Sequence, residues 1–182
     1  MPRKVMVSPV AGEWYPNTKL GLQAELGEVT NGLVADRKPG VCAVLVPHAG
    51  YQFSGRTAAQ ALMSVDPAGL KRIVVIGPSH HVAMRNVLSI PDAEVFRTPL
   101  GDLPCDAAFA DKLRKLPFVI SNPQAHDREH SDQIQLPLIQ TCLSTNLPVV
   151  CMVRGEWDYA HIVPAAAALR KLFDDGTVVV LT

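Results

Sequence analysis

The sequence lacks an excess of charge of either sign, and it has no cluster of basic residues. Its 182 residues include 17 Lys and Arg residues and 17 Asp and Glu residues, so the formal net charge at pH 7 is zero. Nucleic acids and anionic membrane surfaces both attract proteins with a positive field. Neither is therefore an expected partner of this chain.

Long apolar runs and closely spaced cysteines are also missing. No run approaches the roughly 20 residues that a membrane helix requires, and Pro9 interrupts the N-terminal segment before it could form the apolar core of a signal peptide. No CxxC spacing occurs among the four cysteines, which are Cys42, Cys105, Cys142 and Cys151. We predict a cytoplasmic protein with reduced cysteines, and we expect Cys42 and Cys151 to be buried because they lie in apolar runs.

The sequence does contain four short apolar runs that are rich in β-branched residues. Because they do not alternate with polar residues, they are typical of strands covered on both faces of a parallel sheet. They span residues 41–46, 72–77, 148–153 and 177–182. Helix-like segments lie before and between them, at residues 17–30, 55–65, 106–116 and 158–173. This alternation predicts one α/β domain over residues 1–182, with a mostly parallel central sheet and helices on both faces.

The last apolar run extends to Thr182, the final residue of the sequence. Ligands of open α/β sheets bind beyond the carboxyl ends of the strands. No loop or helix follows this run to form such a binding edge or to cover the sheet. We therefore interpret the chain as a domain that is incomplete at its C-terminus.

Histidines follow two of the predicted strands. His48 comes after the first run and His80 after the second, and the ends of neighbouring parallel strands lie roughly 5–10 Å apart. Pro47 and Pro78 stiffen the two turns, so the imidazoles could converge on one metal ion. Alternatively, each is an ordinary hydrogen-bonded side chain. His81 could be a further ligand, a partner of a ligand, or an exposed residue.

A further histidine lies in the polar segment 126–140. We expect a helix that begins near Ser131 and that ends or bends at Pro137. His130, at the start of this helix, could face the same crevice and act as an acid or base. The alternative is that His126 and His130 are both loop residues among charged neighbours.

Several of these segments together resemble the Memo family, which includes the bacterial proteins called AmmeMemoRadiSam system protein B. The similarity is colinear over the whole chain. It is carried by AGEWYP (11–16), VPHAGYQFSG (46–55), GPSHH (77–81), FRTPLGDL (96–103) and EHSDQIQLPLIQ (129–140). The resemblance implies a fold like that of the LigB-type class III extradiol dioxygenases.

The resemblance also implies roles for individual residues. His48 and His80 match two metal ligands of the family, and His130 matches a histidine of the cleft, which we assign as the catalytic acid or base. We place Tyr51 and His81 at the pocket or in contact with the ligands. The implied cofactor is iron or copper.

The sequence departs from the family pattern at three places. Val10 stands where the family has a histidine, and Gln133 replaces the carboxylate of the family's HSxE motif. We place Gln133 beside the pocket. The family's third metal ligand is a cysteine beyond the end of this chain, so the resemblance implies only two ligands here.

Two functions follow from this reading. The first is a metal-dependent oxidoreductase of dioxygenase-like architecture. The second is a non-catalytic module that retains the dioxygenase fold and binds a small molecule or a peptide. The sequence does not decide between iron and copper, and it does not identify the substrate or the oligomeric state.

Overall fold

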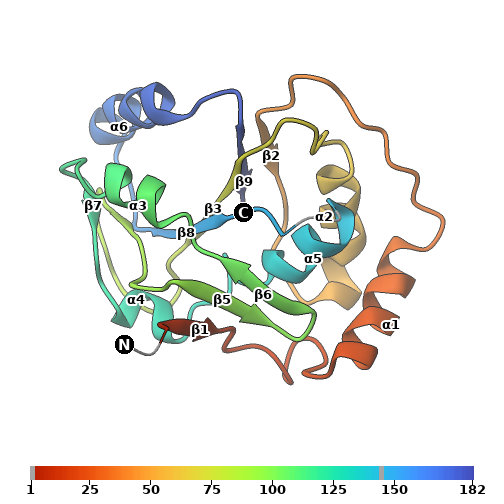
Figure 1. Ribbon diagram of the computed structural model, residues 1–182. Helices are drawn as coiled ribbons and strands as arrows, with labels where there is room; N and C mark the ends of the chain where they lie inside the picture. Colours follow the sequence, from red (N-terminus) through yellow and green to blue (C-terminus); the bar gives the residue numbers. More distant parts are fainter. Residues whose placement is uncertain (1–2, 144–145) are drawn as a thin grey trace.

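The four apolar runs form four neighbouring strands of a six-stranded sheet in the computed structural model, which describes residues 3–143 and 146–182 (Figure 1). The strand order is β2-β9-β3-β8-β4-β7. Only the β4–β8 pairing is antiparallel among these neighbours, so the expectation of a mostly parallel sheet is confirmed. The strands are β2 (Ala43–Leu45), β3 (Arg72–Pro78), β4 (Leu88–Ser89), β7 (Val119–Ile120), β8 (Val149–Arg154) and β9 (Thr177–Leu181).

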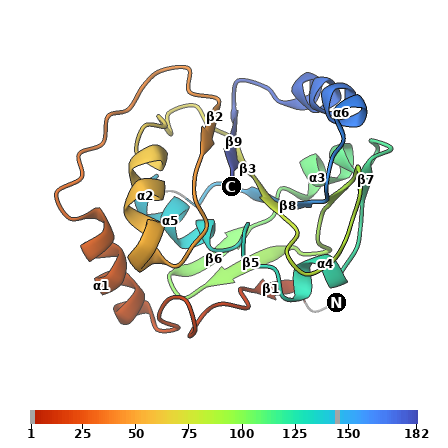
Figure 2. The same cartoon turned by 180° about the vertical axis from the view of Figure 1, so that it is seen from behind.

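Helices flank both faces of this sheet, as the sequence predicts (Figures 1 and 2). One apolar cluster joins the sheet to α1 (Lys19–Thr30), α2 (Arg56–Leu62) and α5 (Gln135–Cys142). A second cluster joins the opposite face to α3 (Ala107–Leu113) and α6 (Tyr159–Leu172). The remaining elements are a π-helix, η1 (Tyr51–Gly55), the short α4 (Gln124–Asp127), and a second, three-stranded sheet of β1 (Val5–Val7), β5 (Val95–Thr98) and β6 (Gly101–Pro104).

Strand β3 shows why the central runs are apolar at every position. Ile73 and Val75 pack into the first cluster, whereas Val74 and Ile76 pack into the second. The edge strand β2 differs, because Val44 is buried while the side chain of Leu45 is 77% exposed. The expectation that all four strands are covered on both faces is therefore wrong for β2, over which no described helix packs on the second face.

The helix expected near Ser131 begins later in the chain. Residues 131–134 form turns, and α5 starts at Gln135. Pro137 consequently lies in the first turn of α5, where its missing N–H would have had no partner within the helix. It does not end the helix, and α6 likewise continues through Pro164. The late start of α5 leaves residues 131–134 free to adopt the geometry of the site described below.

Cys142 and Cys151 are buried, but Cys42 is exposed, which corrects the expectation for that residue.

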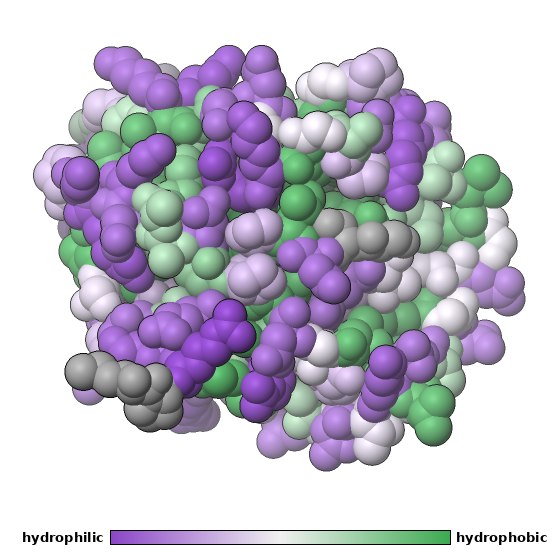
Figure 3. Space-filling view, viewed as in Figure 1, coloured by the Kyte–Doolittle hydropathy of each residue, from purple (hydrophilic) through white to green (hydrophobic). Residues whose placement is uncertain are grey.

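Hydrophilic and hydrophobic residues are interspersed on the face shown in Figure 3, as expected for a chain of balanced charge. Within the part of the chain that the structure describes, no helix is both long and apolar enough to cross a bilayer. Cytoplasmic location stays a prediction.

The burial of one histidine, His126, makes the stability of the fold depend on pH. His126 lies in α4, and its Nε2 is 2.8 Å from the hydroxyl of Ser89. Burial lowers the pKa of His126 to about 4, although Glu129 and Asp127 act in the opposite direction. The unfolded chain therefore binds a proton near pH 6.5 that the folded chain excludes until about pH 4.

We expect the folded state to lose about 3 kcal/mol relative to a His126→Gln variant as the pH falls from 6.5 to 4. Glutamine stays neutral over this range, so the variant lacks this proton uptake. Urea unfolding of both proteins at several pH values measures the difference. Parallel pH profiles for the two proteins would contradict the assignment of a neutral, buried His126.

Candidate metal centre

Three histidines converge at the carboxyl edge of the large sheet. His48 follows β2, His80 follows β3, and His130 lies in the segment before α5. The ring centroids of His48 and His80 are 5.2 Å apart, and those of His80 and His130 are 4.7 Å apart. Each ring offers one nitrogen, and these three nitrogens lie within 4.8 Å of one another. Small ring rotations would bring them to the separation of about 3 Å that ligands of a single ion require.

A buried carboxylate, Glu129, holds this cluster together. Its oxygens accept hydrogen bonds from the backbone N–H groups of His80 (2.6 Å), His130 (2.9 Å) and Ser131 (3.0 Å). Nδ1 of His80 lies 2.9 Å from the same carboxylate. Burial raises the pKa of Glu129, but the hydrogen bonds from His80, Ser131 and His130 outweigh it and hold the pKa at about 2. Glu129 is therefore ionised at neutral pH although its side chain is fully buried.

The ionised carboxylate determines the tautomer of His80. A carboxylate can only accept hydrogen bonds, so Nδ1 of His80 carries the proton and donates it to Glu129. In the neutral form of the ring, the lone pair is then on Nε2 of His80. A carboxylate that orients a histidine in this way is the usual outer partner of a metal-bound imidazole.

The other two rings are held in the neutral form. Burial lowers the pKa of His48, with further contributions from His80 and Arg154. Burial likewise lowers the pKa of His130, again with a contribution from His80. Neutral imidazoles keep the lone pairs that a metal needs, and they suit zinc, copper, iron and nickel. The three histidines could therefore form a metal site.

The close approach of two chain segments explains how His130 reaches this edge. Ser131 lies against Gly77 of β3, and its hydroxyl donates to the carbonyl of Pro78 at 2.8 Å. A Cβ atom on Gly77 would lie 2.8 Å from Cβ of Ser131 and 2.9 Å from the backbone nitrogen of Asp132. Glycine is thus needed at this position because the two backbones pack in direct contact.

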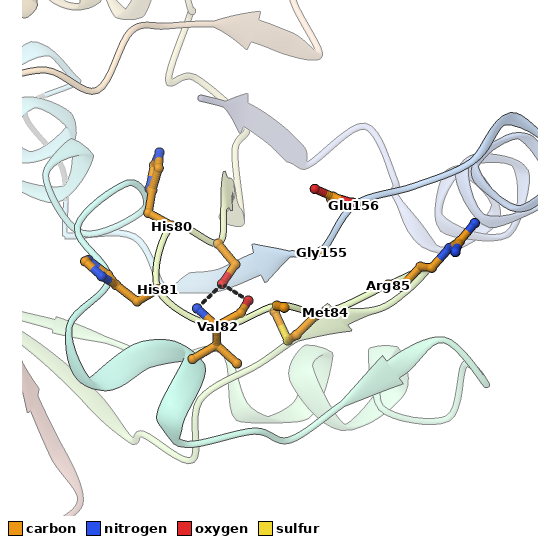
Figure 4. Close-up of a pocket in the computed structure, with 9 residues that line it drawn as sticks. His80, His81, Val82, Met84, Arg85, Gly155 and Glu156 are labelled. Carbon is orange, nitrogen blue, oxygen red and sulfur yellow. Dashed lines mark hydrogen bonds between the residues drawn. The ribbon is translucent and has the colours of Figure 1, made fainter.

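A cavity of about 510 Å³ opens beside His80. Figure 4 shows the side chains of His80 and His81 projecting from the loop after β3, with Glu156 on the opposite side. Ser79 closes this loop, because its hydroxyl donates to the carbonyl of Val82 and accepts from the N–H of the same residue. A ligand in this cavity would lie next to the histidine cluster.

A second cavity of about 390 Å³ lies beside the cluster on the side of the N-terminal segment. Trp14 and Phe53 both line it, and the side chain of Phe53 is 79% exposed. The ring of Trp14 contacts His130, with a centroid separation of 4.2 Å. The histidine cluster therefore has a cavity of mixed polarity beside His80 and an aromatic cavity beside Trp14.

The structure places the remaining predicted residues around this cluster. His81 is exposed, lines the first cavity and has its ring 6.5 Å from that of His130. Tyr51 is buried, stacks on Tyr15 and donates a 2.6 Å hydrogen bond to the carbonyl of Ile134. It therefore supports the turn that follows His130 and does not line either cavity described above.

Gln133 and its neighbour Asp132 are both buried beneath the surface of the site. Nε2 of Gln133 and both carboxylate oxygens of Asp132 have no well-aligned hydrogen-bond partner. Burial and the charge of Glu129 raise the pKa of Asp132 to about 7, against a smaller effect of nearby backbone N–H groups. Gln133 thus lies inside the protein and not on the cavity wall.

Glu129 and Trp14 are residues of the site that are absent from the sequence predictions. Glu129 directly precedes His130, and a hydrogen-bonding carboxylate beside a histidine pair is a pattern that could have indicated it. Trp14 lies far from the histidines in the chain, and no local pattern links it to His130. Its position depends on how the N-terminal segment packs.

A protein-family model described as "Memo-like protein" matches residues 7–182. The chain is 38% identical over 128 residues to "Protein MEMO1" of Danio rerio and 35% identical over 128 residues to "Protein MEMO1" of Homo sapiens. Each alignment covers 70% of this chain and 42% of the relative. A "MEMO1 family protein" of Aquifex aeolicus (strain VF5) is 32% identical over 137 residues, which cover 75% of this chain and 50% of the relative. The matches therefore span half or less of each relative's length.

Replacing the buried carboxylate tests its structural role. We expect Glu129→Gln to lower the free energy of unfolding at pH 7 by about 2–4 kcal/mol, because charged hydrogen bonds are lost and an amide donor faces other donors. Glu28→Gln, on the exposed face of α1, is the matched control and should change it by less than about 0.5 kcal/mol. Equal stability of the two variants would contradict the role of Glu129.

Replacing Gly77 tests the contact between β3 and the segment that carries His130. We expect Gly77→Ala to lower the free energy of unfolding by about 1–3 kcal/mol, because the added methyl group forces Ser131 and Asp132 away from β3. Gly27→Ala is the control, since a Cβ at Gly27 of α1 meets no atom within 4 Å. Chemical denaturation measures both changes, and a neutral or stabilising Gly77→Ala would show that the two segments are not in direct contact.

Proposed function

Because the chain belongs to the Memo-like protein family, we propose that it binds a first-row transition metal through His48, His80 and His130. We further propose that the protein uses this metal in an oxidation reaction. The relatives are at least twice as long as the region they share with this chain, so the activity, substrate and partners of a whole protein belong to this proposal. The convergence of three ring nitrogens within 4.8 Å is the observation that carries it.

The donor set and its surroundings support metal binding. All three ligands would be imidazoles, and Glu129 already orients His80 with Nε2 free. The adjacent cavity offers room for a ligand on the exposed side. When bound, the metal would supply Lewis-acid or redox chemistry to a molecule in that cavity. Iron and copper, the metals that the resemblance to the Memo family implies, both accept imidazole ligands.

His130 has two possible roles in this proposal. As the third ligand, it would complete a set that the resemblance to the family limits to two histidines in this chain. As an acid or base, it would accept a proton from a bound molecule, for which its neutral form at pH 7 is suited. Its contact with Trp14 places it at the boundary between the cluster and the aromatic cavity.

A second candidate function is ligand binding without catalysis. The specific observation in its favour is the cavity between Trp14 and Phe53, because an exposed phenylalanine beside a tryptophan offers an apolar surface to a small molecule or a peptide. In this case the metal, where present, would have a structural or ligand-anchoring role.

Metal content of histidine variants tests the proposal. We expect purified protein loaded with Fe(II), Cu(II) or Zn(II) and then desalted to retain about one metal per chain, and His48→Ala and His80→Ala to lose most of it. His161→Ala is the control, because this exposed residue lies on α6 and is hydrogen-bonded only locally, to Asp158. Elemental analysis measures the stoichiometry. Retention of metal by both site variants would refute the centre.

His130→Ala separates the two roles of His130. Loss of metal would identify a ligand, whereas retained metal would identify an acid or base.

An aerobic screen of small molecules with metal-loaded protein distinguishes the two proposed functions. Oxygen uptake that depends on both metal and His130 supports an oxidoreductase. Ligand binding that persists after chelation, without oxygen uptake, supports the binding module.

A further inference from the structure

We infer that Thr182 and Gln135 are positioning residues that hold His48 in the orientation for metal binding. This inference rests on the proposed metal site, and it concerns two residues for which the sequence predicts no role. Neither residue would touch the metal. Both would act through the imidazole of His48.

The topology places Thr182 between the two strand-end histidines. His48 follows β2 and His80 follows β3, and β9 lies between these strands in the sheet. The N–H of Thr182 donates to the carbonyl of Ile76 in β3 at 3.0 Å, and the N–H of Val46 donates to the carbonyl of Leu181 at 2.8 Å. The sheet therefore holds Thr182 at the end of β9, between the two strands that His48 and His80 follow.

The side chain of Thr182 contacts His48 directly. Its hydroxyl oxygen lies 2.9 Å from Nδ1 of His48. The same hydroxyl oxygen accepts a 3.0 Å hydrogen bond from Nε2 of Gln135. Gln135 is fully buried in the first turn of α5. Burial restricts the movement of its amide, which therefore holds the hydroxyl of Thr182 in place.

Gln135 also fixes the backbone next to His48. The second proton of its amide nitrogen is donated to the carbonyl of Pro47 at 2.9 Å. One buried amide thus holds the residue before His48 and the hydroxyl that contacts the ring. Such an arrangement restricts both the position and the rotation of the imidazole.

The chemistry of metal binding requires an acceptor at this place. An imidazole that binds a metal through Nε2 keeps its proton on Nδ1 and must donate it. A hydroxyl oxygen has two lone pairs, so Thr182 can accept from Gln135 and from Nδ1 of His48 at once. The outer partner of His48 would then be a neutral hydroxyl, whereas that of His80 is the carboxylate of Glu129. The two ligands would therefore differ in basicity.

Substitutions of Thr182 separate the hydrogen bond from the shape of the side chain. Thr182→Val keeps the shape but can neither accept nor donate, and we expect its dissociation constant for Co(II) to rise about 10-fold. Thr182→Ser retains the hydroxyl and should stay within about twofold of the wild type, since outer-partner effects depend on the hydrogen bond. Thr30→Val in α1 is the remote control. Calorimetry gives the affinities, and the visible spectrum of bound Co(II) should shift in Thr182→Val but not in Thr182→Ser.

Substitution of Gln135 tests its two hydrogen bonds, to Thr182 and to the carbonyl of Pro47. Gln135→Met removes both donated hydrogen bonds at similar volume, and we expect at least the same loss of Co(II) affinity as in Thr182→Val. Thermal melts of the metal-free variants show whether each one folds. Unchanged Co(II) affinity and spectrum in a folded Thr182→Val protein would overturn the inference.

A metal-free experiment keeps this inference distinct from the proposed function. If the wild-type protein binds no metal, the proposed centre fails, and crystal structures of the metal-free proteins still test the positioning role. We expect one orientation of the His48 ring in the wild type and in Thr182→Ser, and several in Thr182→Val. A single, unchanged orientation in Thr182→Val would refute the positioning role.

Discussion

The carboxylate of Glu129 is the interaction on which the arrangement of the site depends. It is fully buried and ionised, and it is stabilised by donors from two segments that are far apart in the chain, the loop after β3 and the turn before α5. Because a buried charge without such donors is very costly, the two segments must stay together for the chain to fold. The same contacts bring the side chains of His80 and His130 next to each other. Packing of the fold and alignment of the histidines are thus one requirement.

The order of the strands adds a second constraint. β2 and β3 are separated by β9, so His48 and His80 start from strands two spacings apart, about 10 Å. Their rings nevertheless lie 5.2 Å apart, and His48 contacts the residue that ends the intervening strand, Thr182. The residue at that end must be small enough to leave room and polar enough to satisfy Nδ1 of His48, and Thr182 meets both conditions.

The sequence predicts the parts of this arrangement that follow from local patterns. Uniformly apolar runs identify β3 and β8 because both faces of a central strand are covered, and the rule that ligands bind beyond strand ends points to His48 and His80. The same reasoning fails for β2, since nothing in its composition distinguishes an edge strand with Leu45 exposed from a covered one. It also misplaces the start of α5, because Ser131 reads as a helix cap when its hydroxyl in fact bonds to Pro78 across the sheet edge.

Glu129 and Asp132 show most directly why the rest could not be read from the sequence. They are acidic residues three positions apart, in one polar segment, and both are fully buried. The pKa of Glu129 is held at about 2 because backbone N–H groups and an imidazole replace its hydration, whereas burial and the neighbouring charge raise the pKa of Asp132 to about 7. Two of the four donors to Glu129, its backbone N–H and ring partners in His80, come from a residue 49 positions away. Which carboxylate carries the charge is therefore decided by tertiary contacts and not by the residue type or its local sequence.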